Sequence, residues 1–332
     1  MKTRSIGLVL ETQDDAIDTG TSNLIDAYHW REPMEIAVIT EAIEAAGHKV
    51  VVIGTPRQLC LEAERYLRKI DFIFNLSVGF ISRYRLALGP ALYELLKMPY
   101  SGADPYTKMI SQNKHMMKSF WDKIGISTPQ WVYIGNPRDL DSQILPDYPV
   151  IVKPAHEGSS IGINIDSVVS DSDELHKKVS HILESLGMPV ILEKFIEGRE
   201  FRIGIIGNEE IDFLGITEDV KPDGQSMGNE LLYFDLKKAG KCSKKPHSAN
   251  DPEFRELVDD AIRTYQLFLP VDYGTMDVRI DADGKHHFLE FNADATLHPS
   301  RTLSQCCQLN GLDFQGMINK ILETSLKRWN IR

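Results

Sequence analysis

One segment, GTMDVRIDADGKHHFLEFN at positions 274–292, predicts a β-hairpin and so joins two strands late in the chain. Polar and apolar residues alternate along both arms, as they do where neighbouring side chains of a strand point to opposite faces of a sheet. The arms are joined by Asp-Ala-Asp-Gly, in which Gly284 supplies the positive φ that such turns need. The segment therefore predicts an antiparallel strand pair with one acidic face.

The acidic face of this hairpin has a predicted register. Packing the apolar residues of both arms on one side places Thr275 opposite Glu290 and Asp277 opposite Phe288. Asp277 then lies diagonal to Glu290, with about 7–8 Å between their Cα atoms. Little neutralises the two carboxylates except Arg279, and like charges this close favour a bound cation between them.

A divalent metal site is one interpretation of this face. Asp277, Glu290 and Asn292 offer two carboxylates and an amide oxygen along one edge. Oxygen ligands of this kind suit Mg²⁺ or Mn²⁺, which also bind phosphate oxygens. A surface hairpin with a solvated acidic face has the same pattern, so the hairpin alone leaves both interpretations open.

The composition is that of a soluble globular protein. Of the 332 residues, 42% are hydrophobic and 26% are charged, and the net charge is −11. That charge argues against nucleic acid as a partner, because phosphate backbones require basic surfaces. The four cysteines show no metal-binding spacing, and no apolar run approaches the ~18 residues of a membrane span. We expect a cytoplasmic protein that does not bind a membrane.

The order of predicted elements divides the chain into three domains. Residues 1–105 alternate strand and helix patterns, which predicts a parallel sheet with helices on its faces. Residues 106–194 and 195–332 instead mix helices and strands in two α+β units. The expected fold class is therefore α/β and α+β, and no G-x-G-x-x-G follows a strand to indicate dinucleotide binding.

Three local predictions bear on how the site is built. The polar residues 11–30 predict an irregular loop. Ser111 is the expected N-cap of a helix over 111–124, which Gly125 ends. A strand is expected at 161–165, directly after a glycine-serine loop.

That glycine-serine loop belongs to VIVKPAHEGSSIGI, residues 150–163, whose composition is typical of phosphate binding. Its strand ends near Lys153, and the glycines that follow allow backbone N–H groups to approach phosphate oxygens. It is not a Walker A loop, because G-K-[ST] is missing. A glycine-rich turn that binds no ligand is the alternative interpretation.

Two weaker signals accompany this loop. The segment ILEKFIEGREF, residues 191–201, is an extended connection that can read an adenine edge through backbone groups, and Glu200 can accept hydrogen bonds from ribose hydroxyls. Lys114 lies in a predicted helix, where a lone lysine is usually solvated. Phosphate loop, connection and acidic hairpin together are more specific than any one of them.

In this combination the chain resembles the ATP-grasp enzymes, and among them the D-alanine–D-alanine ligases. VIVKPAHEGSSIGI is similar to the ligases' K-P-x-x-E-G-S-S-x-G, LEKFIEGREF resembles their hinge, and DVRIDADGKHHFLEFN resembles their metal-binding strands. The resemblance runs from about Asn75 to the C-terminal helix. It implies a three-domain ATP-grasp fold with ATP between the second and third domains.

The resemblance also implies roles for individual residues. The expected ATP-binding residues are Lys114, Lys153, Ser159, Ser160, Glu193, Lys194, Ile196 and Glu200. Two ions of Mg²⁺ or Mn²⁺ would be bound by Asp277, Glu290 and Asn292, and the catalytic candidates are Ser159 and Arg279. In such ligases ATP phosphorylates a carboxylate, and the amine of a second substrate attacks the acylphosphate.

The segments that would bind the amino-acid substrates depart from the pattern of these ligases. They place an arginine two residues before the first metal aspartate, where this chain has Thr275, and Arg279 is the candidate substitute. Their H-G-x-x-G-E-D-G is replaced by residues 77–85. Where they carry a Pro-Gly after the metal asparagine, this chain has Ala293-Asp294-Ala295-Thr296. The candidate substrate residues on the altered segments are Arg83, Arg85, Thr296, His298, Ser300 and Arg301.

These observations predict an ADP-forming carboxylate–amine ligase that takes ATP, a carboxylate such as an amino acid, and an amine. The altered segments favour substrates other than two D-alanines. A true D-alanine–D-alanine ligase of cell-wall synthesis and a non-catalytic ATP-binding homologue are the alternatives. Related ligases are commonly dimers, so the resemblance also implies a homodimer.

Overall fold

Three parallel strands form the N-terminal sheet in the order β2-β1-β3, which confirms the parallel sheet predicted for this part of the chain. The structure is a computed structural model that describes residues 2–18, 30–80, 82–158, 162–228, 242–293 and 295–331. The strands are β1 (Ser5–Val9), β2 (Lys49–Gly54) and β3 (Phe72–Asn75), and the helices are α1 (Gln13–Asp18), α2 (Pro33–Ala45), α3 (Pro56–Leu61), α4 (Ala63–Leu67) and α5 (Arg85–Leu95). Gly7 brings β1 close to its neighbours, since a Cβ there would lie 2.6 Å from Ile53 Cδ1.

A four-stranded antiparallel sheet in the order β4-β7-β5-β6 follows in the chain. Its strands are β4 (Trp131–Ile134), β5 (Val150–Pro154), β6 (Val168–Val169) and β7 (Val190–Lys194). Helix α8 (Ser172–Leu186) covers one face and packs Leu175, Val179 and Ile182 into a core shared with β5 and β7. The helix starts where the Asp171 side chain accepts a hydrogen bond from Glu174 N at 2.9 Å.

The third sheet has five strands in the order β10-β9-β8-β11-β12 and is antiparallel throughout. Its strands are β8 (Arg199–Gly207), β9 (Ile211–Val220), β10 (Ser243–His247), β11 (Asp272–Ile280) and β12 (His286–Asn292). The remaining helices are α6 (Pro105–Gln112), α7 (Lys114–Ile124), α10 (Arg255–Leu267), α11 (Thr302–Leu309) and α12 (Phe314–Arg328). No helix in the described part of the chain has the length and apolar character needed to cross a bilayer.

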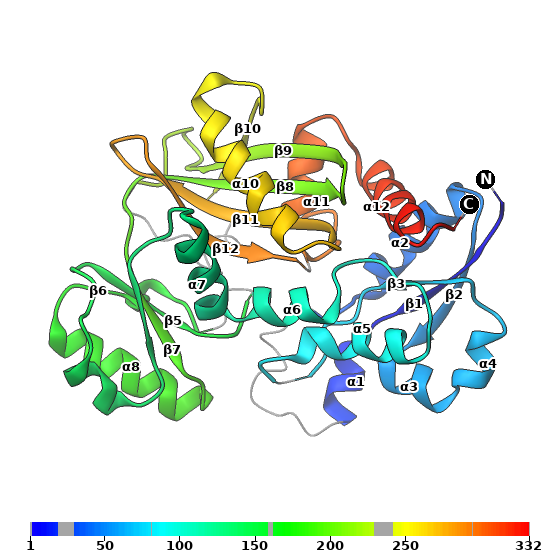
Figure 1. Cartoon of the computed structure of the whole chain (residues 1–332), viewed down its shortest axis with the longest axis horizontal. Helices are drawn as coiled ribbons and strands as arrows, with labels where there is room; N and C mark the ends of the chain where they lie inside the picture. The colour runs from blue at the N-terminus through cyan, green and yellow to red at the C-terminus, as the bar shows by residue number, and fades with distance from the viewer. Residues whose placement is uncertain are drawn as a thin grey trace.

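Two hydrophobic cores hold the five-stranded sheet in place. Residues of α7 and α10 pack on one face against Phe201, Ile203 and Met276. Residues of α11 and α12 join β1, β3 and α2 in a second core, which links this sheet to the N-terminal sheet. Figure 1 shows α10 lying across the five-stranded sheet, α12 beside α2, and the four-stranded sheet with α8 at the opposite end of the molecule.

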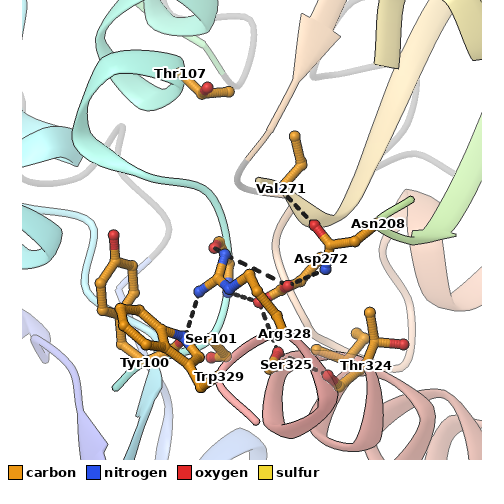
Figure 2. A network of polar contacts seen from close by, with 12 residues as sticks. Tyr100, Ser101, Thr107, Asn208, Val271, Asp272, Thr324, Ser325, Arg328 and Trp329 are labelled. Atoms are coloured by element: carbon orange, nitrogen blue, oxygen red, sulfur yellow. Dashed lines mark hydrogen bonds and ion pairs between the residues drawn. The ribbon is translucent and has the colours of Figure 1, made fainter. Parts of the chain in front are cut away.

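A buried polar network at Asp272 ties the C-terminal helix to the rest of the molecule (Figure 2). Asp272 Oδ2 accepts hydrogen bonds from Gly102 N at 2.7 Å and Ser325 Oγ at 2.7 Å, and Oδ1 accepts one from Asn208 Nδ2 at 2.6 Å. Arg328 lies 3.4 Å from Asp272 Oδ1 and donates to the carbonyl oxygen of Gly102 at 2.8 Å. Burial raises the pKa of Asp272. One aspartate thereby fixes segments from α12, β11 and two connecting loops.

Several predicted elements are corrected by the structure. The helix expected over 111–124 is two helices, with Ser111 buried inside α6 and the chain extended at Asn113. No strand occupies 162–164, and a short 3₁₀ helix at Ile165–Ser167 leads instead into β6. Residues 13–18 form α1 rather than an irregular loop, and 19–29 lie outside the described residues. Helix α11 had no counterpart among the predicted elements.

Candidate active site

A pocket lies where the four-stranded sheet meets the five-stranded sheet. Five of their strands and the start of α7 each contribute charged side chains to it. The lining residues include Lys114, Lys153, Glu193, Lys194, Ile196, Glu200, Arg202, Asp277, Arg279, Leu289 and Glu290. The structure thus brings together most of the predicted ATP-binding residues and both carboxylates of the predicted metal site. Because neighbouring strands supply them, their spacing is fixed by backbone pairing.

The β11–β12 hairpin pairs in a register different from the predicted one. Asp277 lies directly opposite Glu290, and Thr275 lies opposite Asn292. The register shifts between Asp277 and Val278, because a bulge at Leu289 puts two residues of β12 against one of β11. The bulge reverses which face the following residues occupy, and alternation alone could not reveal it. It brings the two carboxylates closer than the diagonal placement that the sequence predicted.

Arg202 is the cation that neutralises Asp277, a role that sequence analysis missed. Its guanidinium lies 2.6 Å from Asp277 Oδ2, 2.6 Å from Glu200 Oε1 and 3.0 Å from Asp219 Oδ2. Arg202 lies opposite Asp277 in the pairing of β8 with β11. The expectation that Arg279 was the main cation beside this face is therefore wrong. Alternation along β8 places Arg202 on the same face as Glu200, and that was the available signal.

Arg279 instead holds the segment that leads from β7 to β8. It donates from Nε and Nη2 to Glu200 Oε2 at 3.0 Å and 2.8 Å, and from Nη1 to the carbonyl oxygen of Ile196 at 2.7 Å. Its guanidinium also lies 4.7 Å from the ring centroid of Phe195. These contacts place Arg279 at the predicted hinge and orient Glu200.

Lys114 connects the loop after β5 to the β11–β12 hairpin. The break at Asn113 starts α7 at Lys114, whose backbone N–H donates to Ala155 O at 2.8 Å. Its side chain donates to the carbonyl oxygen of Glu157 and lies 2.9 Å from Glu290 Oε1. Burial opposes the charge of Glu290, but Lys114 and Lys153 hold the pKa of Glu290 below its ordinary value. The sequence signal for Lys114 was weak, because its partners are distant in the chain.

A second buried charge cluster is centred on Glu193. Lys153 Nζ donates to Glu193 Oε2 at 2.8 Å, and Lys118 Nζ lies 3.5 Å from the same oxygen. Burial lowers the pKa of Lys118 to about 8. Glu193 lines the pocket, and its Oε1 is buried with no hydrogen-bond partner among the described residues. Lys118 was not predicted, although it follows Lys114 by one helical turn.

The predicted phosphate loop is described only in part. Glu157 is buried, and its carboxylate lies 3.1 Å from Arg85 Nη2. Glu157 and Gly158 line the pocket next to Lys153. Ser159 and Ser160, both predicted to bind ATP, lie outside the described residues.

The predicted substrate residues lie apart from the pocket. None of the six, Arg83, Arg85, Thr296, His298, Ser300 and Arg301, is among the lining residues that the structure describes. Arg85 reaches the phosphate loop through Glu157, whereas Arg83 is exposed. His298 Nδ1 and Ser300 Oγ lie 2.8 Å apart, within the loop that precedes α11.

Two residues of the N-terminal sheet region, Glu11 and Arg31, lie near the predicted substrate residues Arg85 and Arg301. Glu11 is buried and accepts a hydrogen bond from Val78 N at 2.7 Å. Burial raises the pKa of Glu11 to about 7, although Arg31 and Arg85 oppose that shift. Arg31 is buried and lies 2.7 Å from Glu35 Oε1. Neither residue was predicted, because each gains its burial only when segments far apart in the sequence pack together.

The donor set of the pocket fits a divalent cation that arrives with other oxygen ligands. The described residues hold no group of three or more His, Cys, Asp or Glu side chains placed to bind a metal ion. Asp277 and Glu290 face each other across neighbouring strands, and the amide of Asn292 follows on β12. Two carboxylates and an amide suit an ion that takes its remaining ligands from phosphates or water.

Comparison with known proteins identifies the family. The family model described as D-ala D-ala ligase C-terminus matches residues 120–323, more than half of the chain. The chain belongs to this family. The matched residues include the end of α7, the four-stranded sheet, the five-stranded sheet and most of α12. The predicted recognition of a D-alanine–D-alanine ligase-like chain is thereby confirmed.

Relatives and solved structures extend over nearly the whole chain. An uncharacterized protein y4sG of Sinorhizobium fredii is 24% identical over 300 residues, covering 88% of this chain and 87% of the relative. A D-alanine–D-alanine ligase of Aquifex aeolicus is 25% identical and covers 86% of this chain and 92% of its own. The solved D-alanine–D-alanine ligase of Bacillus anthracis complexed with ATP has a TM-score of 0.72 at 19% identity, with 99% of both chains covered.

The predicted fold and enzyme class are confirmed by these comparisons. The fold is that of the ATP-grasp ligases, with a parallel N-terminal sheet and two antiparallel sheets. The chain is an ATP-dependent C–N ligase of the ADP-forming type. The VanG D-Ala:D-Ser ligase of Enterococcus faecalis also shares the fold, with a TM-score of 0.70 at 17% identity.

Proposed function

We propose that the protein is a carboxylate–amine ligase that works through an acylphosphate and joins substrates other than two D-alanines. The composition of the pocket is the observation that supports a ligase working through an acylphosphate. Lys114 and Lys153 lie beside the paired carboxylates Asp277 and Glu290, between two sheets of an ATP-grasp fold. Cations for phosphate oxygens and carboxylates for a divalent ion are the two groups that phosphoryl transfer requires.

In this proposal the four-stranded and five-stranded sheets hold ATP between them. Lys114 and Lys153 bind its phosphates, together with Ser159 and Ser160 of the loop. Glu193 receives the adenine amino group, and Lys194 and Ile196 line the ring. Glu200, oriented by Arg202 and Arg279, accepts hydrogen bonds from the ribose.

The residues around the phosphates then determine the chemistry. Mg²⁺ or Mn²⁺, bound by Asp277, Glu290 and Asn292, would neutralise charge on the transferring phosphoryl group. The lysines hold that group in line with the substrate carboxylate, which becomes an acylphosphate. A positioned amine then displaces phosphate, and little covalent chemistry is left to the protein because orientation supplies much of the rate.

The second part of the proposal concerns the substrates. Arg85 and Arg301, with Arg83, Thr296, His298 and Ser300, are the proposed substrate residues, on segments that differ from the ligases' pattern. The solved relatives carry both D-alanine and D-serine in their names, so the fold accommodates more than one amino-acid pair. Buried Glu11 and Arg31 beside Arg85 add charge to this side of the molecule.

An ADP-release assay over a panel of D- and L-amino acids and other amines tests the proposal. Efficient turnover with a carboxylate and an amine other than D-alanine supports it, with the product identified by mass spectrometry. Efficient turnover with D-alanine alone would make the protein a true D-alanine–D-alanine ligase. Tight ATP binding without turnover on any substrate pair would instead indicate a non-catalytic homologue.

A further inference from the structure

A row of alternating charges crosses the pocket face of the five-stranded sheet. Lys244 on β10 lies 2.5 Å from Asp219 on β9, Asp219 lies 3.0 Å from Arg202 on β8, and Arg202 lies 2.6 Å from Asp277 on β11. These four strands are direct neighbours in the sheet. The row ends at the carboxylate that is proposed to bind a divalent ion.

Arg202 is the central residue of this row and cannot leave it easily. Its side chain is 4% exposed, and its guanidinium contacts Glu200, Asp219 and Asp277 together. A planar guanidinium among three buried acceptors is a fixed group, since removing it would leave buried carboxylates uncompensated.

Charge is therefore closely balanced before any ligand binds. Within the described residues, Arg202 pairs with Asp277, Arg279 pairs with Glu200, and Lys244 pairs with Asp219. At the other carboxylate of the hairpin, Lys114 lies 2.9 Å from Glu290. A divalent cation that enters without a nucleotide meets two carboxylates that already have cationic partners, and is repelled by those cations.

We propose that Arg202 is a positioning residue that holds the Asp277 carboxylate and makes divalent-cation binding in this pocket depend on ATP. The inference rests on the proposed function, which assigns Asp277 and Glu290 to a metal. The negative charge of ATP would outweigh the positive charge of the lysine and arginine side chains in the pocket. Lys114 would then pair with the phosphates instead of with Glu290. Arg202 remains in place throughout and presents Asp277 in one orientation.

Arg279 does not fill this role, although it is close. Its hydrogen bonds to Glu200 and to the carbonyl oxygen of Ile196 direct it toward the β7–β8 connection. Arg202, in contrast, is the cross-strand partner of Asp277 in the β8–β11 pairing. Two residues before Asp277, the same pairing places Thr275 opposite Gly204, and neither residue can supply a cation to Asp277.

The test is Mn²⁺ binding to the whole protein with and without a non-hydrolysable ATP analogue. Electron paramagnetic resonance measures the free ion, and the Mn²⁺ that the analogue binds in a protein-free sample is subtracted. Wild-type protein should bind Mn²⁺ at least about tenfold more tightly with the analogue present, because the resident cations oppose the bare ion. Arg202→Gln should gain about tenfold in Mn²⁺ affinity without the analogue. Arg199→Gln is the matched control, because Arg199 lies on the same strand and pairs with Glu218 and Glu253 instead.

The outcomes separate this inference from the proposed function. Equal Mn²⁺ affinity with and without the analogue in the wild type would overturn the inference and leave the metal assignment standing. Absence of Mn²⁺ binding even with the analogue would overturn the metal assignment itself. If Arg202→Gln does not fold, the double variant Arg202→Gln/Asp219→Asn removes one charge of each sign. It should show the same gain, and unchanged affinity there would contradict the role of Arg202.

Discussion

The nucleotide pocket and the proposed substrate side differ in how their charges are held. In the pocket, Lys153, Glu193, Asp277 and Glu290 extend from the strands of two sheets, so hydrogen-bonded register fixes their spacing. On the substrate side, charged residues such as Arg85 come from loops and helix ends, and several are buried by packing between segments distant in sequence.

This difference suggests which side can change substrate without losing the fold. A strand-borne site tolerates little change, since one altered residue disturbs pairs on both neighbouring strands. Loop-borne residues are positioned by fewer backbone hydrogen bonds and vary more readily. The chain fits this view, because its phosphate loop and hairpin resemble the ligases while residues 77–85 and 293–301 do not.

The largest expected effect is the loss of turnover when a carboxylate on the strands of the pocket is replaced. Asp277→Asn and Glu290→Gln should each lower the rate of ADP release by about 10³-fold, because each removes a charge from the proposed metal site. Both variants should keep the wild-type circular-dichroism spectrum, because each replaces a carboxylate with an amide of the same shape. Glu253→Gln, at an exposed carboxylate away from the pocket, is the control. A wild-type rate in either pocket variant would refute the metal assignment.

The sequence predicted the strand-borne side better than the other, for a physical reason. Alternation of polar and apolar residues identified the hairpin at 274–292, which β11 and β12 form. It could not reveal the bulge at Leu289, because a bulge changes the register without changing the residue pattern. The pairing of Asp277 with Arg202 was missed for a related reason, since it depends on which strands are neighbours.

The substrate side was harder to predict, because its burial is created by tertiary packing. Arg31 and Glu11 have no distinctive local pattern, yet both are buried once α2 and the loop after β3 pack beside β1. Helix α11, which begins directly after the candidate substrate residue Arg301, was also missed. The break at Asn113, which places Lys114, likewise depends on a hydrogen bond to Ala155.

A pH-dependent stability effect should come from the substrate side. The pKa of Glu11 is about 7 in the folded protein and 4.5 in its ordinary state, so the folded protein binds this proton more tightly than the unfolded chain. Its stabilising contribution is fully present below pH 4.5 and is lost as pH rises through 7. Relative to Glu11→Gln, the wild type should lose about 3 kcal/mol across this range.

Urea unfolding of both proteins between pH 5 and 8 measures this difference. Glu41→Gln, at an exposed position on α2, should show no such pH-dependent difference from the wild type. A constant difference between wild type and Glu11→Gln at every pH would show that Glu11 ionises normally in the folded protein.

A smaller effect is expected for ATP affinity at Lys153. Lys153→Gln removes a charge proposed to contact phosphate and weakens the pairing of Glu193. We expect ATP to bind about 10–100-fold more weakly, the cost of a charge-assisted contact. Lys327→Gln is the control, since the exposed Lys327 side chain pairs with Glu210 and is not among the described residues that line the pocket. Calorimetry with an ATP analogue measures both, and equal affinities for the two variants would remove Lys153 from the phosphate site.

The smallest effect should appear at the loop before α11, where it tests the comparison most directly. Arg301 is partly buried, and burial lowers its pKa while Glu35 and Glu32 oppose that shift. Arg301→Gln should raise the KM of one amino-acid substrate by about tenfold or less and leave the KM of ATP unchanged, because a partly solvated charge contributes little. Ser300→Ala, at an exposed residue whose hydroxyl contacts His298, should change either KM less than about threefold. A rise in the KM of ATP for Arg301→Gln would show that this loop couples to the nucleotide pocket, and the two sides would then form one site.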